Sequence, residues 1–185
     1  FMELYEYGWI KKTPRMAIAV AEGAPTLADL YNDYGLRWNG GDIDNSIIED
    51  YYNEVERKGV KAKTRASAIE ILKPVNLKKA LRTLEFTNGV VIKVSDNEIL
   101  DAMAMVSKNG FGCEPASAAT VAGTKKLVND GTIRKDETVV GIATGHMLKD
   151  VPAIVDYHYS SENRFANKPI TVKPDMKEIL KLVGS

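Results

Sequence analysis

At 185 residues, with 25 basic and 25 acidic side chains and a formal net charge of zero, the chain suits one domain and offers no electrostatic footprint for nucleic acid. Its single cysteine excludes an intrachain disulfide, and with only two histidines it is poor material for a zinc site, so we expect no metal. No apolar run reaches the roughly 18 residues of a membrane span and no leader pattern opens the chain, so we expect a cytoplasmic protein without a membrane partner.

The first predicted elements are a short helix and a buried strand. Residues 1–7 carry apolar side chains on one helical face. Residues 16–21, MAIAVA, form a continuous apolar run, which is typical of a strand covered on both faces. The run ends at Glu22 and Gly23, where the backbone either approaches a ligand closely or makes a plain turn.

The composition shifts to Tyr, Asn, Asp and Gly between residues 30 and 63, and a charged helix is predicted over residues 45–58. We interpret residues 30–63 as an insertion or a mobile subdomain. Asp42 and Asp44 suggest calcium, but the remaining ligands of a calcium loop are missing. We therefore favour a loop that ends in a helix cap.

Helix and strand alternate in the middle of the chain. A helix is predicted over residues 76–86, a strand over 90–94 and a helix over 97–107. Ser95 and Glu98 have the spacing of a capping box at the start of that last helix. The pattern indicates an α/β fold, which we expect to be a three-layer, open, mostly parallel sheet with helices on both faces.

The next helix is predicted from Pro115 to residue 130, since proline suits the first position of a helix. Its small residues lie on one stripe, which lets a helix lie close on a sheet; they are Ala116, Ala119 and Gly123. Glu114 either lines a cleft or caps this helix. For Ser117 we favour a local backbone hydrogen bond over a contact with a ligand. Cys113 is expected to be a small buried residue.

A buried strand is predicted over residues 138–143, and it stops at Thr144 and Gly145. Ligands of open parallel sheets bind outside the carboxyl ends of strands, so the threonine hydroxyl is a candidate contact. On the local pattern alone we favour a plain turn at these two residues over a contact with a ligand. Lys149 is interpreted as a turn or surface lysine.

The end of the chain is predicted to hold three further elements. Residues 157–159, YHY, are interpreted as a strand or loop. A last strand is expected over residues 169–172, and a helix over residues 174–183.

Two motifs carry a resemblance to a known family. The stretch GCEPASAA at residues 112–119, followed by TGHMLKD at residues 144–150, resembles the threonine synthase family of pyridoxal-phosphate enzymes of fold type II. Shorter matches precede them in the same order: PRM at 14–16, AEGA at 21–24, ASAI at 66–69 and PVN at 74–76. The resemblance covers nearly the whole chain and is weakest between residues 30 and 63.

The resemblance implies a cofactor, pyridoxal 5'-phosphate, and a reaction, the conversion of O-phospho-L-homoserine and water to L-threonine and phosphate. It is a resemblance to the family's C-terminal half only. The family's Schiff-base lysine motif, Ser-Phe-Lys-Asp, and its phosphate loop, Gly-Asn-Ala-Gly-Asn, do not occur in this sequence. We therefore expect residues 1–185 to be a C-terminal portion of the cofactor-binding domain that holds no catalytic residue and is inactive alone. The expected partner is the missing N-terminal half, and a homodimer stays open.

By motif, the resemblance gives Thr144 the position facing the pyridine nitrogen of the cofactor. A hydroxyl donates a hydrogen bond to a neutral nitrogen, whereas an aspartate would hold that nitrogen protonated. Thr144 and Gly145 are thus the expected cofactor-binding residues. Weaker candidates are Glu114, Ser117, Glu22 and Gly23.

Two other functions compete with this one. The first is a fragment of a threonine or serine dehydratase, or of another lyase of fold type II. The second is a non-catalytic α/β module for binding or interaction.

Overall fold

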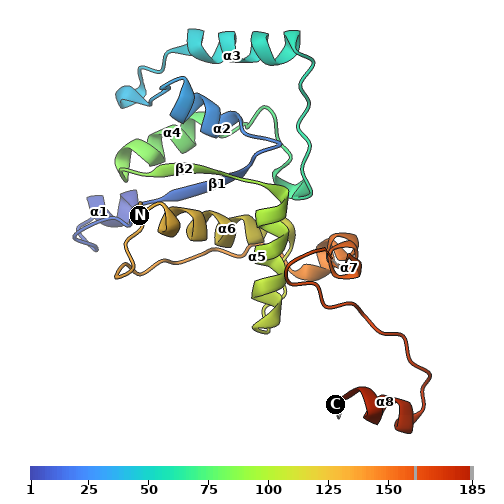
Figure 1. Ribbon diagram of the computed structural model, residues 1–185. Helices are drawn as coiled ribbons and strands as arrows, with labels where there is room; N and C mark the ends of the chain where they lie inside the picture. The colour runs from blue at the N-terminus through green and yellow to red at the C-terminus, as the bar shows by residue number, and fades with distance from the viewer. Residues whose placement is uncertain (161, 184–185) are drawn as a thin grey trace.

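The centre of the fold is a two-stranded parallel sheet. The computed structural model describes residues 1–160 and 162–183, and Figure 1 shows the sheet between two groups of helices. Strand β1 (Ala17–Ala21) pairs with β2 (Val90–Val94), with Ala17 opposite Val90 and Ala21 opposite Val94. Both strands lie where the sequence predicts them, since β1 is a continuous apolar run and β2 is rich in β-branched residues.

Helices account for most of the remaining regular structure. The α-helices in the described residues are α1 (Met2–Glu6), α2 (Thr26–Ala28), α3 (Asn45–Arg57), α4 (Leu77–Phe86), α5 (Asp96–Lys108), α6 (Pro115–Asn129), α7 (Val151–Tyr159) and α8 (Met176–Val183). Shorter helical turns are a π-helical turn, Asp29–Asp33, and 3-10 turns at Asn39–Gly41, Ser67–Ile69 and Met147–Lys149. Every helix that the sequence predicts is present close to its predicted bounds.

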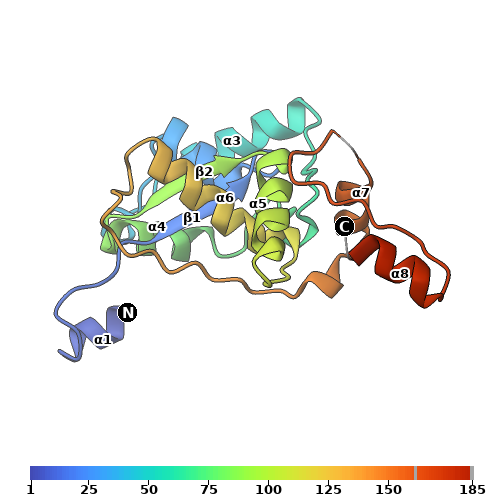
Figure 2. The ribbon, with the colours of Figure 1, turned by 60° about the horizontal axis from the view of Figure 1, so that its bottom comes forward.

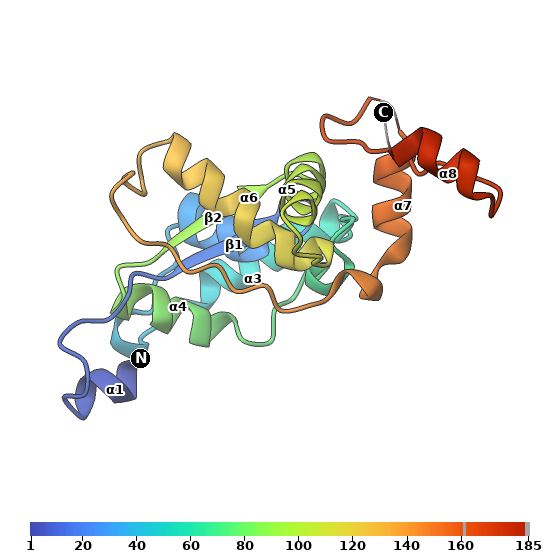
Figure 3. The same ribbon diagram turned by 90° about the horizontal axis from the view of Figure 1, so that it is seen from below.

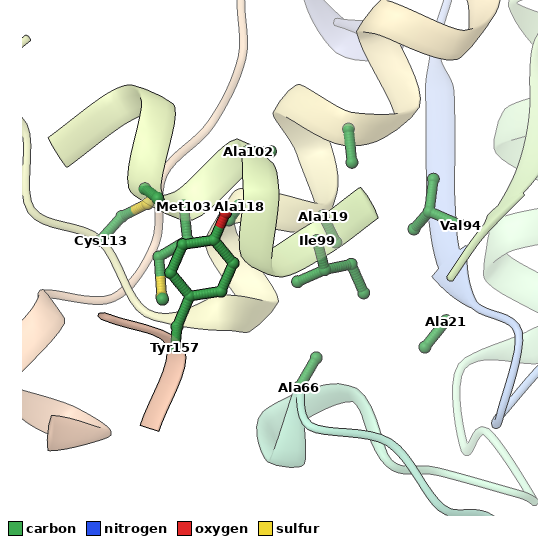
Figure 4. Packing of buried hydrophobic residues seen from close by; sticks show 12 residues of the cluster. Ala21, Ala66, Val94, Ile99, Ala102, Met103, Cys113, Ala118, Ala119 and Tyr157 are labelled. Carbon is green, nitrogen blue, oxygen red and sulfur yellow. The ribbon is translucent and has the colours of Figure 1, made fainter. Parts of the chain in front are cut away.

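The helices cover both faces of the sheet. In Figure 1, α5 and α6 lie on one face, whereas α2 and α4 lie on the other, with α3 farther out. Each face has its own hydrophobic cluster. The first, shown in Figure 4, includes Ala21, Val94, Ile99, Met103, Ala118, Ala119 and Tyr157. The second includes Leu30, Leu36, Tyr51, Val55, Leu81, Leu84 and Val91. The α/β class and the parallel sheet are therefore confirmed.

Residues 30–63 take part in this packing. Leu36 is buried, as are Tyr51 and Val55 on α3, and all three belong to the second cluster together with Leu81 of α4. That the region is an insertion in the family stays a prediction.

Local capping explains where two helices begin. The Ser95 hydroxyl accepts a hydrogen bond from the Glu98 N–H at 3.2 Å, and the Glu98 carboxylate accepts one from the Ser95 N–H at 2.8 Å. This is the predicted capping box at the start of α5. At the start of α3, the Asp44 carboxylate accepts a hydrogen bond from the Ser46 N–H at 3.0 Å. The interpretation of Asp44 as a helix cap is therefore confirmed.

Helix α6 lies close on the sheet through its small residues. Ala119 is buried, and an added Cβ at Gly123 would come within 2.7 Å of the Ala19 Cβ and 3.1 Å of Ile92 Cγ2. Because no side chain stands between the helix and the strands here, α6 crosses the middle of the sheet at short range. This is the role that the sequence predicts for the stripe.

The buried strand predicted over residues 138–143 is wrong. These residues pair with neither β1 nor β2, and Val140 and Ile142 are 84% and 65% exposed. The segment runs beside α6 instead, the orange trace in Figure 3, with an added Cβ at Gly141 3.4 Å from the Thr120 side chain. A strand needs a neighbour for its backbone N–H and C=O groups. No described residue supplies one here.

Two predictions near the end of the chain are also wrong. Residues 157–159 are helical, as the last turn of α7, where Tyr157 is buried and donates a hydrogen bond to Asp101 at 2.6 Å. Residues 169–172 form no strand, because no described segment pairs with them.

The two terminal helices stand apart from the core at opposite ends of the molecule, as Figure 2 shows. Helix α1 contacts α4 through an edge-to-face pair of Tyr5 and Phe86, whose ring centroids are 6.1 Å apart. Helix α8 has no buried residue. Among the described residues, no helix combines the length and the apolar character needed to cross a membrane.

Candidate functional site

The first turn of α6 and the turn at residues 144–146 are held together by backbone contacts. The Glu114 N–H donates a hydrogen bond to the Gly145 carbonyl at 3.0 Å. Cys113 and His146 form an isolated antiparallel bridge directly beside this bond. Four of the residues singled out in the sequence therefore lie together at the start of α6: Glu114, Ser117, Thr144 and Gly145.

Ser117 is the buried centre of this group, with 2% of its surface exposed. Its Oγ accepts a hydrogen bond from the Gly145 N–H at 2.8 Å and lies 3.2 Å from Oγ1 of Thr144. The local backbone bond favoured for Ser117 is therefore wrong. Its hydroxyl faces the turn 28 residues away because Ser117 lies on the inner side of the first turn of α6. Thr144, by contrast, is exposed.

Glu114 is a buried carboxylate, 6% exposed, that precedes α6. It stands at the N-cap position, but its side chain makes no capping hydrogen bond, so the capping interpretation is wrong. Both carboxylate oxygens face the Lys149 ammonium group instead, at 3.2 and 3.3 Å. A buried carboxylate requires such a cationic partner, because transfer of an unpaired charge from water to the protein interior is unfavourable.

The packing of Glu114 requires a glycine at residue 145. The Glu114 side chain packs so closely on it that an added Cβ would overlap the carboxylate. The absence of a side chain at residue 145 thus lets Glu114 stay buried while its carboxylate reaches Lys149.

Glu22 and Gly23 make contacts elsewhere. The Glu22 N–H donates to the Val94 carbonyl at 2.9 Å, and its carboxylate lies 3.9 Å from the Lys126 ammonium group. Gly23 packs against the backbone of Lys63, where an added Cβ would overlap the carbonyl. These contacts tie both residues to strand ends and a neighbouring loop, and none of them reaches Thr144.

The Lys149–Glu114 ion pair was missed by the sequence interpretation, which placed Lys149 in a turn or on the surface. Its side chain is indeed 60% exposed, but its charged end is fixed on a buried carboxylate. The two residues are 35 positions apart, so no local pattern links them. The available signal was that each lies in one of the two motifs that carry the resemblance.

Cys113 has the environment expected of a packing residue. It is buried in the first hydrophobic cluster, and burial raises the pKa of its thiol, with the Glu114 carboxylate acting in the same direction. A raised pKa disfavours the thiolate, which is the nucleophilic form. In the described part of the chain, no group of three or more His, Cys, Asp or Glu side chains is arranged to hold a metal ion.

Comparison with known proteins gives a consistent picture. The family described as "Pyridoxal-phosphate dependent enzyme" matches residues 7–145. Similar curated proteins are named threonine synthase. One from Methanocaldococcus jannaschii is 35% identical over 98% of this chain and 39% of its own length. One from Methanosarcina acetivorans is 50% identical over 50% of this chain and 23% of its own. A third, "Threonine synthase 2, chloroplastic" from Arabidopsis thaliana, is 28% identical over 95% of this chain and 31% of its own.

The chain thus spans less than half the length of these curated relatives. The family match ends at residue 145, so it takes in the sheet, α6, and the Thr144–Gly145 turn that packs on the start of α6. Because this match covers most of the sequence, the chain belongs to the family of pyridoxal-phosphate dependent enzymes.

Proposed function

We propose that the chain is the C-terminal portion of a threonine synthase, which converts O-phospho-L-homoserine and water to L-threonine and phosphate. The names of the relatives support the reaction. The observation in the structure that supports the site is the hydroxyl of the exposed Thr144, which contacts the buried Ser117 in the first turn of α6. The inactivity of residues 1–185 alone remains a prediction.

The described residues fit one end of pyridoxal phosphate. When bound, this cofactor supplies an electron sink for bonds broken at the substrate carbon attached to it. Thr144 would hold its ring nitrogen, because an exposed hydroxyl donates a hydrogen bond to a neutral aromatic nitrogen. In residues 1–160 and 162–183 we identify no counterpart of the family's phosphate loop or covalent lysine.

The neighbours of Thr144 prepare it for this contact. Both backbone polar groups of Gly145 are hydrogen-bonded. The Gly145 N–H donates to Ser117 Oγ, and the Gly145 carbonyl accepts from the Glu114 N–H. Lys149 balances the Glu114 charge, so that the carboxylate closest to Gly145 is neutralised. An unpaired carboxylate beside a ring nitrogen would favour its protonated form. This set of residues therefore favours a neutral nitrogen.

The proposal is tested in the full-length gene product with two substitutions. Thr144→Asp replaces the donor with an acceptor and should lower turnover by about 10²-fold, the order of magnitude for losing one preorganised donor. Thr144→Ser keeps the hydroxyl and should stay within a few-fold of the wild type. Turnover is measured as phosphate released from O-phosphohomoserine.

The outcomes separate the candidate functions. Unchanged turnover in Thr144→Asp would remove Thr144 from the site. A 2-oxo acid formed from threonine or serine, without phosphate release from O-phosphohomoserine, would identify a dehydratase instead. Binding of small molecules with no turnover of any of these substrates would favour a non-catalytic module.

A further inference from the structure

We infer that Ser117 is a positioning residue that sets the direction of the Thr144 hydroxyl proton. The inference rests on the proposed function, since it assigns the Thr144 hydroxyl to the ring nitrogen of the cofactor. Ser117 itself is 2% exposed, so it acts through Thr144 and not by touching a ligand.

The hydrogen bonds around Ser117 decide where its proton points. A serine hydroxyl has one proton to donate and two lone pairs to accept. The Ser117 oxygen already accepts from the Gly145 N–H at 2.8 Å. Two acceptors remain within reach of its proton, Thr144 Oγ1 at 3.2 Å and the Gly145 carbonyl at 3.5 Å. The carbonyl is at the outer limit of a hydrogen bond and already accepts from the Glu114 N–H at 3.0 Å.

The Ser117 proton is therefore directed at the Thr144 oxygen. With that oxygen acting as an acceptor toward Ser117, the proton of Thr144 is free to point outward. A chain of donors results, from the Gly145 N–H through Ser117 to Thr144, and each bond in such a chain polarises the next. The last donor in this series of hydrogen bonds is the Thr144 hydroxyl, which can donate to an unprotonated ring nitrogen.

This arrangement makes Ser117 a selector of the protonation state of the nitrogen. A protonated nitrogen needs a lone pair of Thr144 Oγ1 in the place where the Thr144 proton points while Ser117 donates to that oxygen. Removing the Ser117 hydroxyl lets the Thr144 hydroxyl rotate and accept, so the protonated form gains stability.

The experiment compares Ser117→Ala with Thr124→Ala in the full-length gene product loaded with pyridoxal phosphate. Thr124 lies on the same helix, and its hydroxyl donates only to the Thr120 carbonyl of that helix, at 2.8 Å. The readouts are kcat and KM for O-phosphohomoserine, the absorbance of the bound cofactor as a function of pH, and the melting temperature.

Ser117→Ala should lower kcat by roughly three- to tenfold, as for one neutral hydrogen bond, with little change in KM. Its cofactor absorbance should titrate at a higher pH than that of the wild type, whereas Thr124→Ala should change neither quantity. Ser117→Cys keeps a weak donor, so its kcat and its absorbance titration should lie between those of the wild type and of Ser117→Ala. This variant replaces Ser117→Ala in the test if the alanine variant does not fold. In the Thr144→Val background, Ser117→Ala should have no further effect on kcat or absorbance, because no hydroxyl is left to orient.

A purely structural role predicts a different result. If Ser117→Ala lowers the melting temperature but leaves kcat and the absorbance titration of the folded protein unchanged, the inference is wrong while the proposed function stands. An equal effect of Ser117→Ala in the Thr144→Val background would overturn it as well. If the wild type releases no phosphate from O-phosphohomoserine, the proposed function itself fails.

Discussion

Gly123 sets how closely α6 approaches the sheet, and Gly123→Ala tests this contact. The new Cβ would lie 2.7 Å from the Ala19 Cβ and 3.1 Å from Ile92 Cγ2. Nonbonded carbon atoms rest about 3.5–4.0 Å apart, so the methyl group overlaps Ala19 by about 1 Å. The Ala19 Cβ is fixed to the backbone and Ile92 is β-branched, so neither side chain turns away easily. The helix or the strand must move.

Two effects of opposite sign decide the stability of Gly123→Ala. Replacing glycine by alanine inside a helix adds about 1 kcal/mol of stability from propensity alone. Overpacking a tight core removes about 1–3 kcal/mol, and the rigid neighbours place this site in the upper part of that range. The net expectation is a loss of about 1–2 kcal/mol in the free energy of unfolding. This loss lowers the melting temperature by about 2–4 °C per kcal/mol in a domain of about 150–250 residues, and by less in the longer full-length product.

The assay is thermal unfolding of the full-length gene product, followed by circular dichroism. Lys125→Ala, at an exposed position of the same helix, is the matched control and should leave the melting temperature nearly unchanged. Adding Ala19→Gly to Gly123→Ala removes the closest contact and should recover part of the loss. A rise in melting temperature for Gly123→Ala would show that propensity wins, and it would refute the close approach of α6.

Two further predictions concern charged groups. Lys149→Met should lower the free energy of unfolding by about 1–2 kcal/mol, because it leaves the buried Glu114 carboxylate without its cation. Urea unfolding measures this loss, and Glu114→Gln in the same background should reverse most of it. Unchanged stability of Lys149→Met would contradict the pairing. Burial raises the pKa of Glu98, but hydrogen bonds from Ser95 and the nearby Lys126 outweigh burial and lower it overall. A lowered pKa stabilises the fold above the ordinary value of 4.5 and loses this contribution as the pH falls through the folded-state value. Glu98→Gln should therefore weaken the protein more at about pH 7 than at about pH 3, and an equal loss at both would contradict this.

Local sequence patterns predicted the parts of the fold that depend on near neighbours. The capping box of Ser95 and Glu98 and the cap at Asp44 involve residues within three positions of each other. The start of α7 had such a signal as well, since the Asp150 carboxylate accepts a hydrogen bond from the Ala153 N–H at 3.2 Å and Pro152 lies in the first turn. Residues 157–159 do not themselves carry this signal, so taken alone the run YHY predicts a strand or loop.

Features that depend on distant partners were beyond the local pattern. The apolar run at residues 138–143 has the composition of a strand, but pairing is decided by a neighbour and not by composition. The contact between Ser117 and Thr144 likewise depends on how α6 is placed against a turn 27 residues away. Only the resemblance brought the two motifs into one site.

The exposed segment at residues 138–143, TVVGIA, is a candidate site of aggregation. It is six residues long, uncharged and free of proline, and its backbone pairs with neither strand. Segments of this kind readily add to the edges of other sheets, so they drive aggregation when they are left uncovered. The charged run RKDE at residues 134–137 directly precedes it, in the position where gatekeeper residues protect such windows. Covering these six residues should therefore lower the tendency of the chain to aggregate.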